Sequence, residues 1–390
     1  MVQKKDGSIY KFNSFRALYK YKEKMNRFFH KLLDLYIKKH IGKHSNQLKN
    51  IEDLNFSLKR FLVISSTALG DTLLSTPAMK SLRKSFPEAE ITTLLNKNIA
   101  PLFKNFKYTD NIILYYGGYK KFLTTLGEIR EKKPEAVLIF HGNGPQDIAF
   151  SVLSGANFIL KHPTKSPHKK YLAFALEQKY QHTIEDRLDL VRMTGGTIIE
   201  KTMEIPPLDN KTAESKIEAS LGNATDLVGF QIGASHVYNM WPIENFIALA
   251  KKILGMNHST QIVITGVKKE YALGELIVNA CGNRVINCCG RFKIDELPCL
   301  IKKMRLLITG DTGPMHLAVA IKVPTISLFS SADSNVTGPY QDLQIHRIIQ
   351  KDGRFAAKLS KKQRDDSAMK LITIDEVFVQ YEDFMHNRSI

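Results

Sequence analysis

Short, mostly apolar runs recur along the chain, and most are followed by a stretch with helical spacing. The first half carries such runs at 61–65, 91–95, 112–115 and 136–140, and the second half at 227–232, 261–265, 284–287, 306–309 and 324–329. Apolar runs bounded by turn residues predict buried strands, and strands that alternate with helices predict parallel sheets with helices on both faces. The pattern therefore predicts an α/β protein built from two doubly wound units.

The intervening segments predict helices and the boundaries of the units. Apolar spacing of three and four residues predicts helices at 72–86, 242–254, 294–303, 312–320 and 374–384, and another after Lys269. The proline-containing stretch 205–210 begins the connection between the units. We accordingly predict a first α/β domain at 58–207, a second at 226–345, and a basic loop with a C-terminal helix at 346–390.

Residues 1–57 differ from the rest of the chain. Apolar positions at 15, 18, 19, 25, 29, 32, 33 and 36 follow helical spacing, and lysines surround them. Two interpretations stay open. The helix lies on an anionic membrane surface through residues 12–41, or it packs against the body of the protein with a solvated basic rim.

Charge and cysteine content narrow the classes of partner and compartment. The chain has a net charge of +18, and residues 1–60 hold 15 Lys and Arg against 5 Asp and Glu. Such an excess favours anionic partners, but no nucleic-acid recognition module is apparent. The sequence has no 18-residue apolar stretch and no secretory signal pattern. Its four cysteines lack zinc-site spacing, which favours buried thiols in a reducing cytoplasm.

The segment from Gly310 to His316 joins a predicted strand to a predicted helix. N–H groups at a helix start, together with the helix dipole, favour a phosphate, and Pro314 suits the first helical turn. Thr312 and Gly313 add further donors, and His316 lies about one turn into the helix. A capped helix with a partly buried histidine explains the same residues, so both interpretations stay open.

A second strand-to-helix turn runs from Ser65 to Asp71. Gly70 permits a tight turn, and Asp71 then lies at the carboxyl edge of the sheet, where a carboxylate can take a proton from an attacking hydroxyl. The alternative is that Asp71 is the N-cap of the helix from Thr72. Two further segments leave strands of the second unit: Ser235 is placed to bind a phosphate there, and Glu270 to accept from ribose hydroxyls or to face a helix dipole.

Together these segments resemble glycosyltransferase family 9, which includes the bacterial lipopolysaccharide heptosyltransferases. The resemblance runs from about Lys59 to Tyr340 and rests on four motifs, which are Leu69–Ala78, Lys80–Pro87, Asp311–Ala318 and Thr337–Tyr340. It implies a GT-B architecture of two Rossmann-like domains facing a cleft, with the donor on the C-terminal domain. It also implies inverting sugar transfer without a metal or other cofactor.

The family's site residues carry over by motif. Asp71 becomes the base that deprotonates the acceptor. The donor-binding positions are Ser235, Glu270, Asp311, Thr312, Gly313 and His316. The acceptor side is expected at Gly70, His141 and Asn143, although many relatives have an acidic residue where this strand ends in His141.

One position departs from the family pattern. Asn239 stands where relatives usually carry a lysine near the pyrophosphate, so Lys268, Lys269 or His236 is expected to supply that charge. The departure also prompts an alternative, a non-catalytic protein that binds a nucleotide sugar, and the charge prompts another, a nucleic-acid-binding protein.

The expected function is transfer of heptose or a related sugar from an ADP- or similar nucleotide donor to a lipopolysaccharide or surface-glycan acceptor. The expected location is the cytoplasm, at the inner face of the inner membrane.

Overall fold

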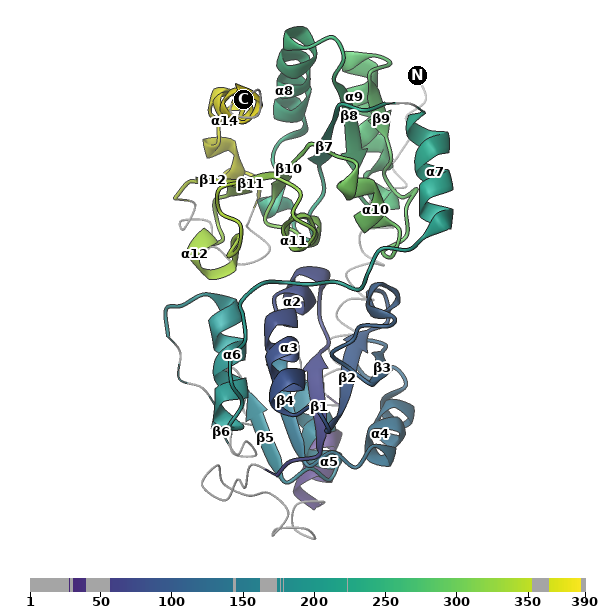
Figure 1. Cartoon of the computed structure of the whole chain (residues 1–390), viewed down its shortest axis with the longest axis vertical. Coiled ribbons are helices and arrows are strands. Elements are labelled where there is room, and N and C mark those ends of the chain that lie inside the picture. The colour runs from purple at the N-terminus through teal and green to yellow at the C-terminus, as the bar shows by residue number, and fades with distance from the viewer. Residues whose placement is uncertain are drawn as a thin grey trace, which may run out of the picture.

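The computed structural model describes residues 28, 31–39, 57–142, 145–161, 174–175, 177, 179–222, 224–352 and 365–386. Within this part of the chain, the strands form two six-stranded sheets in which all pairs are parallel. Figure 1 shows the sheets in two halves, one above the other. The chain therefore has two doubly wound units, as the sequence predicted.

The first sheet has the strand order β3-β2-β1-β4-β5-β6, and the second has β12-β11-β10-β7-β8-β9. The strands of the first sheet are β1 (Arg60–Ser65), β2 (Glu90–Asn96), β3 (Asn111–Tyr115), β4 (Ala136–His141), β5 (Phe158–Lys161) and β6 (Phe174–Ala175). The second contains β7 (Leu227–Gln231), β8 (Gln261–Thr265), β9 (Val285–Asn287), β10 (Leu306–Gly310), β11 (Thr325–Phe329) and β12 (His346–Gln350). Read from the other edge, the second sheet repeats the order of the first, so β7 corresponds to β1 and β10 to β4.

Helices cover both faces of each sheet. They are α2 (Leu69–Leu73), α3 (Thr76–Ser85), α4 (Phe122–Glu131), α5 (Pro145–Leu153), α6 (Thr183–Met193), α7 (Lys211–Leu221), α8 (Ile243–Met256), α9 (Tyr271–Cys281), α10 (Leu297–Lys302), α11 (Gly313–Ala320), α12 (Ser334–Thr337) and α14 (Ile374–His386). None of the described helices is long and apolar enough to cross a membrane.

Strand β1 shows why the sheets are buried on both sides. Phe61 and Val63 belong to one hydrophobic cluster, and Leu62 and Ile64 to another, because alternate side chains point to opposite faces of a strand. The first of these clusters continues into the second half, where it includes Leu317 of α11. The two halves thus share part of their core.

The strands predicted from the sequence are confirmed to within two residues, but one predicted helix is wrong. The segment 72–86 forms two helices, α2 and α3, with a break at residues 74–75. Pro77 explains the second start: it has no N–H to donate into a preceding turn and suits the first turn of a new helix. The strands β5, β6 and β12 were not predicted, and β12 lies within the segment 346–390 and pairs with β11.

The N-terminal helix has one face packed against the body of the protein and another with exposed apolar side chains, so it has features of both the packed and the membrane-bound interpretation. Residues 31–39 are helical, as the spacing predicted. Leu33 and Ile37 are buried in the cluster that contains α4 and α5 side chains. On the same helix Leu35 and Tyr36 are 62% and 47% exposed. Most of the segment 1–57, Asn143 and the basic loop at 361–364 lie outside the described residues.

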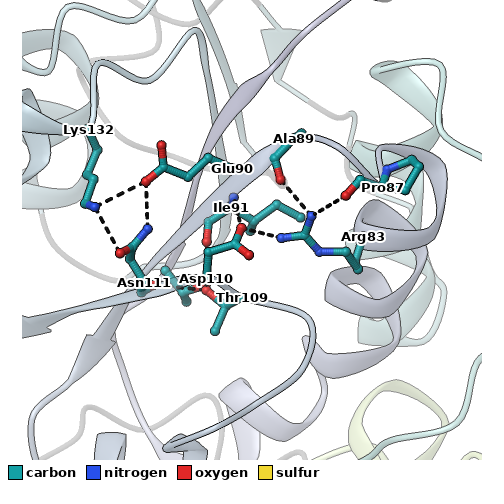
Figure 2. Close-up of polar contacts among 10 residues, drawn as sticks. Arg83, Pro87, Ala89, Glu90, Ile91, Thr109, Asp110, Asn111 and Lys132 are labelled. Atoms are coloured by element: carbon teal, nitrogen blue, oxygen red, sulfur yellow. Dashed lines mark hydrogen bonds and ion pairs between the residues drawn. The ribbon is translucent and has the colours of Figure 1, made fainter.

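Polar contacts tie together the amino ends of β2 and β3, at the edge of the first sheet away from the turn that carries Asp71. Figure 2 shows Arg83 of α3 donating to the carbonyls of Pro87 and Ala89, at 3.0 and 2.7 Å, and pairing with Asp110. The Asp110 carboxylate also accepts from a β2 amide, at 2.7 Å. Nearby, Glu90 accepts from a side-chain amide on β3 and pairs with Lys132, the residue that follows α4, at 2.7 and 3.2 Å. These contacts fix α3 and α4 to the sheet.

Candidate active site

A cavity of about 540 Å³ lies at the junction of the two halves, next to the carboxyl ends of the second sheet. Ala68 and Leu69 line it from the first half. The second half contributes Ser235, Lys268, Lys269, Glu270, Thr312 and Gly313, among other residues. Helices α2 and α11 meet beside it (Figure 1). The cavity is thus placed where α/β proteins bind ligands, outside the carboxyl ends of parallel strands.

Two glycines make room for Glu270 at the floor of the cavity. A Cβ atom at Gly233 would lie 2.0 Å from the Glu270 carboxylate, and one at Gly266 would lie 2.7 Å from it. The carboxylate accepts from the Val267 amide at 2.8 Å and is 5% exposed. The small residues after β7 and β8 therefore let an acceptor group face the cavity, which suits a ligand with hydroxyl donors.

The start of α11 presents donors to the same cavity. Thr312 has extended backbone angles and is the N-cap, so the helix begins at Gly313. Both residues line the cavity. The first N–H groups of a helix have no partner within it, and together with the helix dipole they attract an anion. This end of the cavity is suited to a phosphate group.

The remaining walls combine apolar surface with cations. Phe292, Ile294, Leu297 and Leu300 form an apolar wall suited to a flat ring, while Lys268, Lys269 and Lys293 also line the cavity. Lys293 was not predicted. It follows β9 in a loop at the same edge as the other lining segments, which is the signal that would have found it.

Some predicted donor-site residues lie outside the cavity lining. His316 is 4% exposed, and a Cβ atom on Gly70 would lie 2.6 Å from its ring. Asp311 faces the same histidine, with 3.7 Å between its Oδ1 and the His316 Nε2. His236 stacks on Tyr238, with 4.9 Å between the ring centroids. The donor roles of Asp311, His316 and His236 therefore stay predictions.

Asn239 also lies outside the lining, and its Oδ1 accepts from Ser331 at 2.8 Å. The position that carries the lysine in relatives is therefore occupied by a side chain held against a neighbouring loop. Of the three candidate replacement cations, Lys268 and Lys269 line the cavity and His236 does not, and the role of the two lysines stays a prediction.

Asp71 is not a helix N-cap, so that alternative is wrong. Helix α2 begins at Leu69 with Ala68 as the cap, which places Asp71 in the third helical position. Its Oδ2 accepts from the Thr67 hydroxyl at 2.8 Å, and its Oδ1 lies 3.3 Å from His141 Nε2. Burial raises the pKa of Asp71, but His141, Arg187 and the hydrogen bond from Thr67 outweigh it and hold the pKa below the usual value. Asp71 is therefore ionised at neutral pH.

Arg187 on α6 is a buried cation that the sequence analysis missed. It is 1% exposed, and its terminal nitrogens have no hydrogen-bond partner among the described residues. One of them lies 3.8 Å from Asp71 Oδ1. Burial lowers the pKa of Arg187 to about 10, while Asp71 opposes the shift. The signal was an arginine on the apolar face of α6, three residues after buried Ile184.

His182 joins the two halves beside this site. Its Nε2 donates to the Gly338 carbonyl at 3.1 Å, its Nδ1 accepts from the Ile184 amide at 3.2 Å, and its ring stacks on Tyr340, with 4.1 Å between centroids. Burial lowers the pKa of His182 to about 4. The neutral ring thus holds the motif at 337–340 against α6.

Comparison with known proteins agrees with this geometry. The profile of glycosyltransferase family 9 (heptosyltransferase) matches residues 169–366, just over half of the chain. Lipopolysaccharide heptosyltransferase 3 of Escherichia coli is 23% identical over 321 residues, which cover 78% of this chain and 92% of the relative.

Two solved structures share the fold. A family 9 glycosyl transferase from Veillonella parvula superposes with a TM-score of 0.70 at 20% identity, covering 84% of this chain and 97% of that one. The E. coli ADP-heptose lipopolysaccharide heptosyltransferase II gives 0.69 at 18% identity, covering 85% and 100%. The architecture is GT-B, with two Rossmann-like domains. This chain belongs to glycosyltransferase family 9, the heptosyltransferase family, and is a glycosyltransferase.

Proposed function

We propose that this protein transfers heptose from ADP-heptose to a lipopolysaccharide acceptor, with inversion and without a metal ion. The observation that supports the proposal is the cavity that α2 and α11 border together. Groups suited to a nucleotide sugar line it, and so do Ala68 and Leu69, which precede the ionised Asp71 on the same turn and helix, although Asp71 itself is outside the lining. The names of the relatives support the choice of sugar and acceptor. One is a lipopolysaccharide heptosyltransferase, and a structural neighbour is an ADP-heptose heptosyltransferase.

The donor fits the cavity from one end to the other. The adenine ring lies against the apolar wall of Phe292, Ile294 and Leu297, and the ribose hydroxyls donate to Glu270. The diphosphate lies at the start of α11, where helix N–H groups and the three cavity lysines supply positive charge. These charges stabilise the nucleoside diphosphate as it leaves, which is the role that a metal ion has in other sugar transferases.

Asp71 acts as the base in this proposal. Its carboxylate removes the proton of the acceptor hydroxyl while that oxygen attacks the sugar carbon from the face opposite the diphosphate. One displacement inverts the configuration at that carbon. The acceptor approaches along the carboxyl ends of the first sheet, where Gly70 and His141 lie.

The N-terminal helix supports a location at the inner face of the inner membrane. Phe28, Leu32, Leu35 and Tyr36 expose 46–62% of their surface, while Lys31, Lys38 and Lys39 lie among them and are also exposed. Apolar and aromatic side chains beside lysines are suited to an anionic lipid surface. Because Leu33 and Ile37 dock the same helix on the first half, the membrane would face the acceptor domain.

The experiment has two arms. ADP-, UDP- and GDP-sugars are compared by thermal shift, and we expect ADP-heptose to raise the melting temperature most, because a ligand that binds only the folded state stabilises it. Turnover is then measured with ADP-heptose and heptose-deficient lipopolysaccharide. Asp71→Asn should lower kcat by about 10²- to 10⁴-fold and leave donor affinity nearly unchanged.

Wild-type turnover by that variant would contradict the assignment of the base. Donor binding without turnover by the wild-type protein would favour the non-catalytic alternative.

A further inference from the structure

Three side chains at the carboxyl ends of β1 and β4 form a closed ring of polar contacts. The Thr67 hydroxyl lies 2.8 Å from Asp71 Oδ2 and 2.6 Å from His141 Nδ1. The third contact joins His141 Nε2 to Asp71 Oδ1, at 3.3 Å. Thr67 and His141 come from different strand ends, so the ring exists only because β1 and β4 are neighbours.

Counting protons shows that this ring is incomplete at rest. A threonine hydroxyl and a neutral imidazole carry one exchangeable proton each, and an ionised carboxylate carries none. Two protons therefore serve three contacts. If Thr67 donates to Asp71, then His141 donates to Thr67 from Nδ1, and its Nε2, which faces the carboxylate, carries no proton. If Thr67 donates to His141 instead, its contact with Asp71 has no proton. One additional proton satisfies all three contacts in either direction around the ring.

The pKa values of His141 and Asp71 both lie below their usual values, so the additional proton is absent at neutral pH. Burial, with smaller contributions from Arg187 on α6 and Lys161 on β5, lowers the pKa of His141 to about 4, although Asp71 opposes the shift. Arg187 also helps to hold the pKa of Asp71 low. From the second half, His316 of α11, which faces Asp311, packs against Gly70 next to Asp71. At neutral pH the resting ring is thus ionised and ready to accept.

We propose that Thr67 and His141 are positioning residues that turn Asp71 into a shared proton acceptor. The inference rests on the proposed role of Asp71 as the base. As the acceptor oxygen bonds to the sugar carbon, its O–H bond breaks and the proton goes to the Asp71 carboxylate. The bond between that carbon and the diphosphate oxygen breaks, and its electron pair leaves with the nucleoside diphosphate. The proton completes the ring, shared between Asp71 and His141, and then passes to solvent.

A bound donor raises the affinity of the ring for the additional proton. Ala68 and Leu69, the residues between Thr67 and Gly70, line the donor cavity, so the phosphates bring negative charge close to the ring. Negative charge favours the protonated form of a nearby group. The ring therefore takes up a proton more readily when the donor is bound and releases it more readily after the nucleoside diphosphate leaves.

The test uses the full-length protein with ADP-heptose and heptose-deficient lipopolysaccharide. His141→Gln removes the second proton site, and Thr67→Val removes the bridging hydroxyl at nearly constant volume. We expect each variant to lower kcat by at least about tenfold, with the donor KM within about twofold of wild type. Thr67→Ser retains the hydroxyl and should restore most of the rate. His258→Gln, at an exposed position in the second half, is the matched control.

The pH profile separates a proton role from a merely structural one. We expect the acid limb of kcat to move in His141→Gln, because the proton then has one site instead of two. The titration of His141, followed by NMR of ¹³C-labelled histidine, should move in Thr67→Val and Asp71→Asn. Wild-type kcat in His141→Gln would overturn the inference, and so would a slower variant whose pH profile is unchanged. If Asp71→Asn retains wild-type kcat, the proposed function fails instead.

Discussion

The two sheets have the same strand order, yet the turns at their carboxyl edges do different things. In the first sheet, Asp71 on the helix after β1 and His141 at the end of β4 approach each other, with 3.3 Å between Asp71 Oδ1 and His141 Nε2. In the second, the turns after β7 and β8 carry Gly233 and Gly266, and a cavity of about 540 Å³ opens there. The same strand order thus carries an ionised carboxylate at the edge of one sheet and a cavity at the edge of the other.

Among the changes that test this comparison, the largest effect is expected from a side chain added at the carboxyl edge of the second sheet. Gly233→Ala places a Cβ atom 2.0 Å from the Glu270 carboxylate, which must then leave its place. Losing hydrogen bonds to a charged group should weaken ADP-heptose binding by about 100-fold, measured by calorimetry. Gly255→Ala in α8 is the matched control, because nothing lies within 4 Å of its Cβ atom. Equal affinities of the two variants would mean that Gly233 does not shape the donor site.

The next prediction concerns the contact between α2 and α11, where the two halves approach each other. A Cβ atom on Gly70 would lie 2.6 Å from the His316 ring, so Gly70→Ala pushes α2 away from α11. Because small misplacements of reacting groups are costly, we expect kcat to fall by about tenfold, with donor affinity retained. An unchanged kcat would show that the halves do not need this close approach.

Acid should loosen the junction between the halves. The pKa of His182 is lowered by burial to about 4, whereas that of an unfolded histidine is near 6.5. Between these values the unfolded chain binds a proton that the folded protein does not, so stability falls as pH drops from about 6.5 towards 4. The melting temperature should follow this course and depend less on pH in His182→Gln. His258→Gln should keep the wild-type slope, and equal slopes in both variants would contradict the prediction.

His346 and His141 contribute to acid sensitivity in the same direction. Burial lowers the pKa of each to about 4. The wild-type curve therefore sums several groups, and only the difference between variants reports on His182.

The smallest effect is expected at the amino edge of the first sheet, where Figure 2 shows Arg83 bonded to two carbonyls and to Asp110. Arg83→Met should lower the free energy of unfolding by about 1–2 kcal/mol, measured with urea, because it removes several hydrogen bonds to a charged group. It should leave kcat unchanged, since this edge lies away from Asp71. A large loss of kcat would mean that the two edges are coupled.

Local pattern was enough to predict much of the fold. Runs such as 61–65 and 306–309 are strands because they are apolar and bounded by turns, and the βα alternation requires parallel sheets. The break between α2 and α3 was missed because residues 72–86 keep helical spacing across it, although Pro77 was a sequence signal for the second start. The short strands β5 and β6 were missed because four and two residues give little periodic signal.

The sequence by itself determined the two units and the strand-to-helix segments from which Asp71, Glu270, Thr312 and Gly313 come. Tertiary structure alone decided which of them meet. Thr67 contacts His141 because β1 and β4 are neighbours, and Arg187 reaches Asp71 because α6 packs over the end of β4. Spacing along the chain encodes local conformation, whereas these contacts join residues 74 and 116 positions apart. Such contacts depend on packing between elements, which no local pattern records.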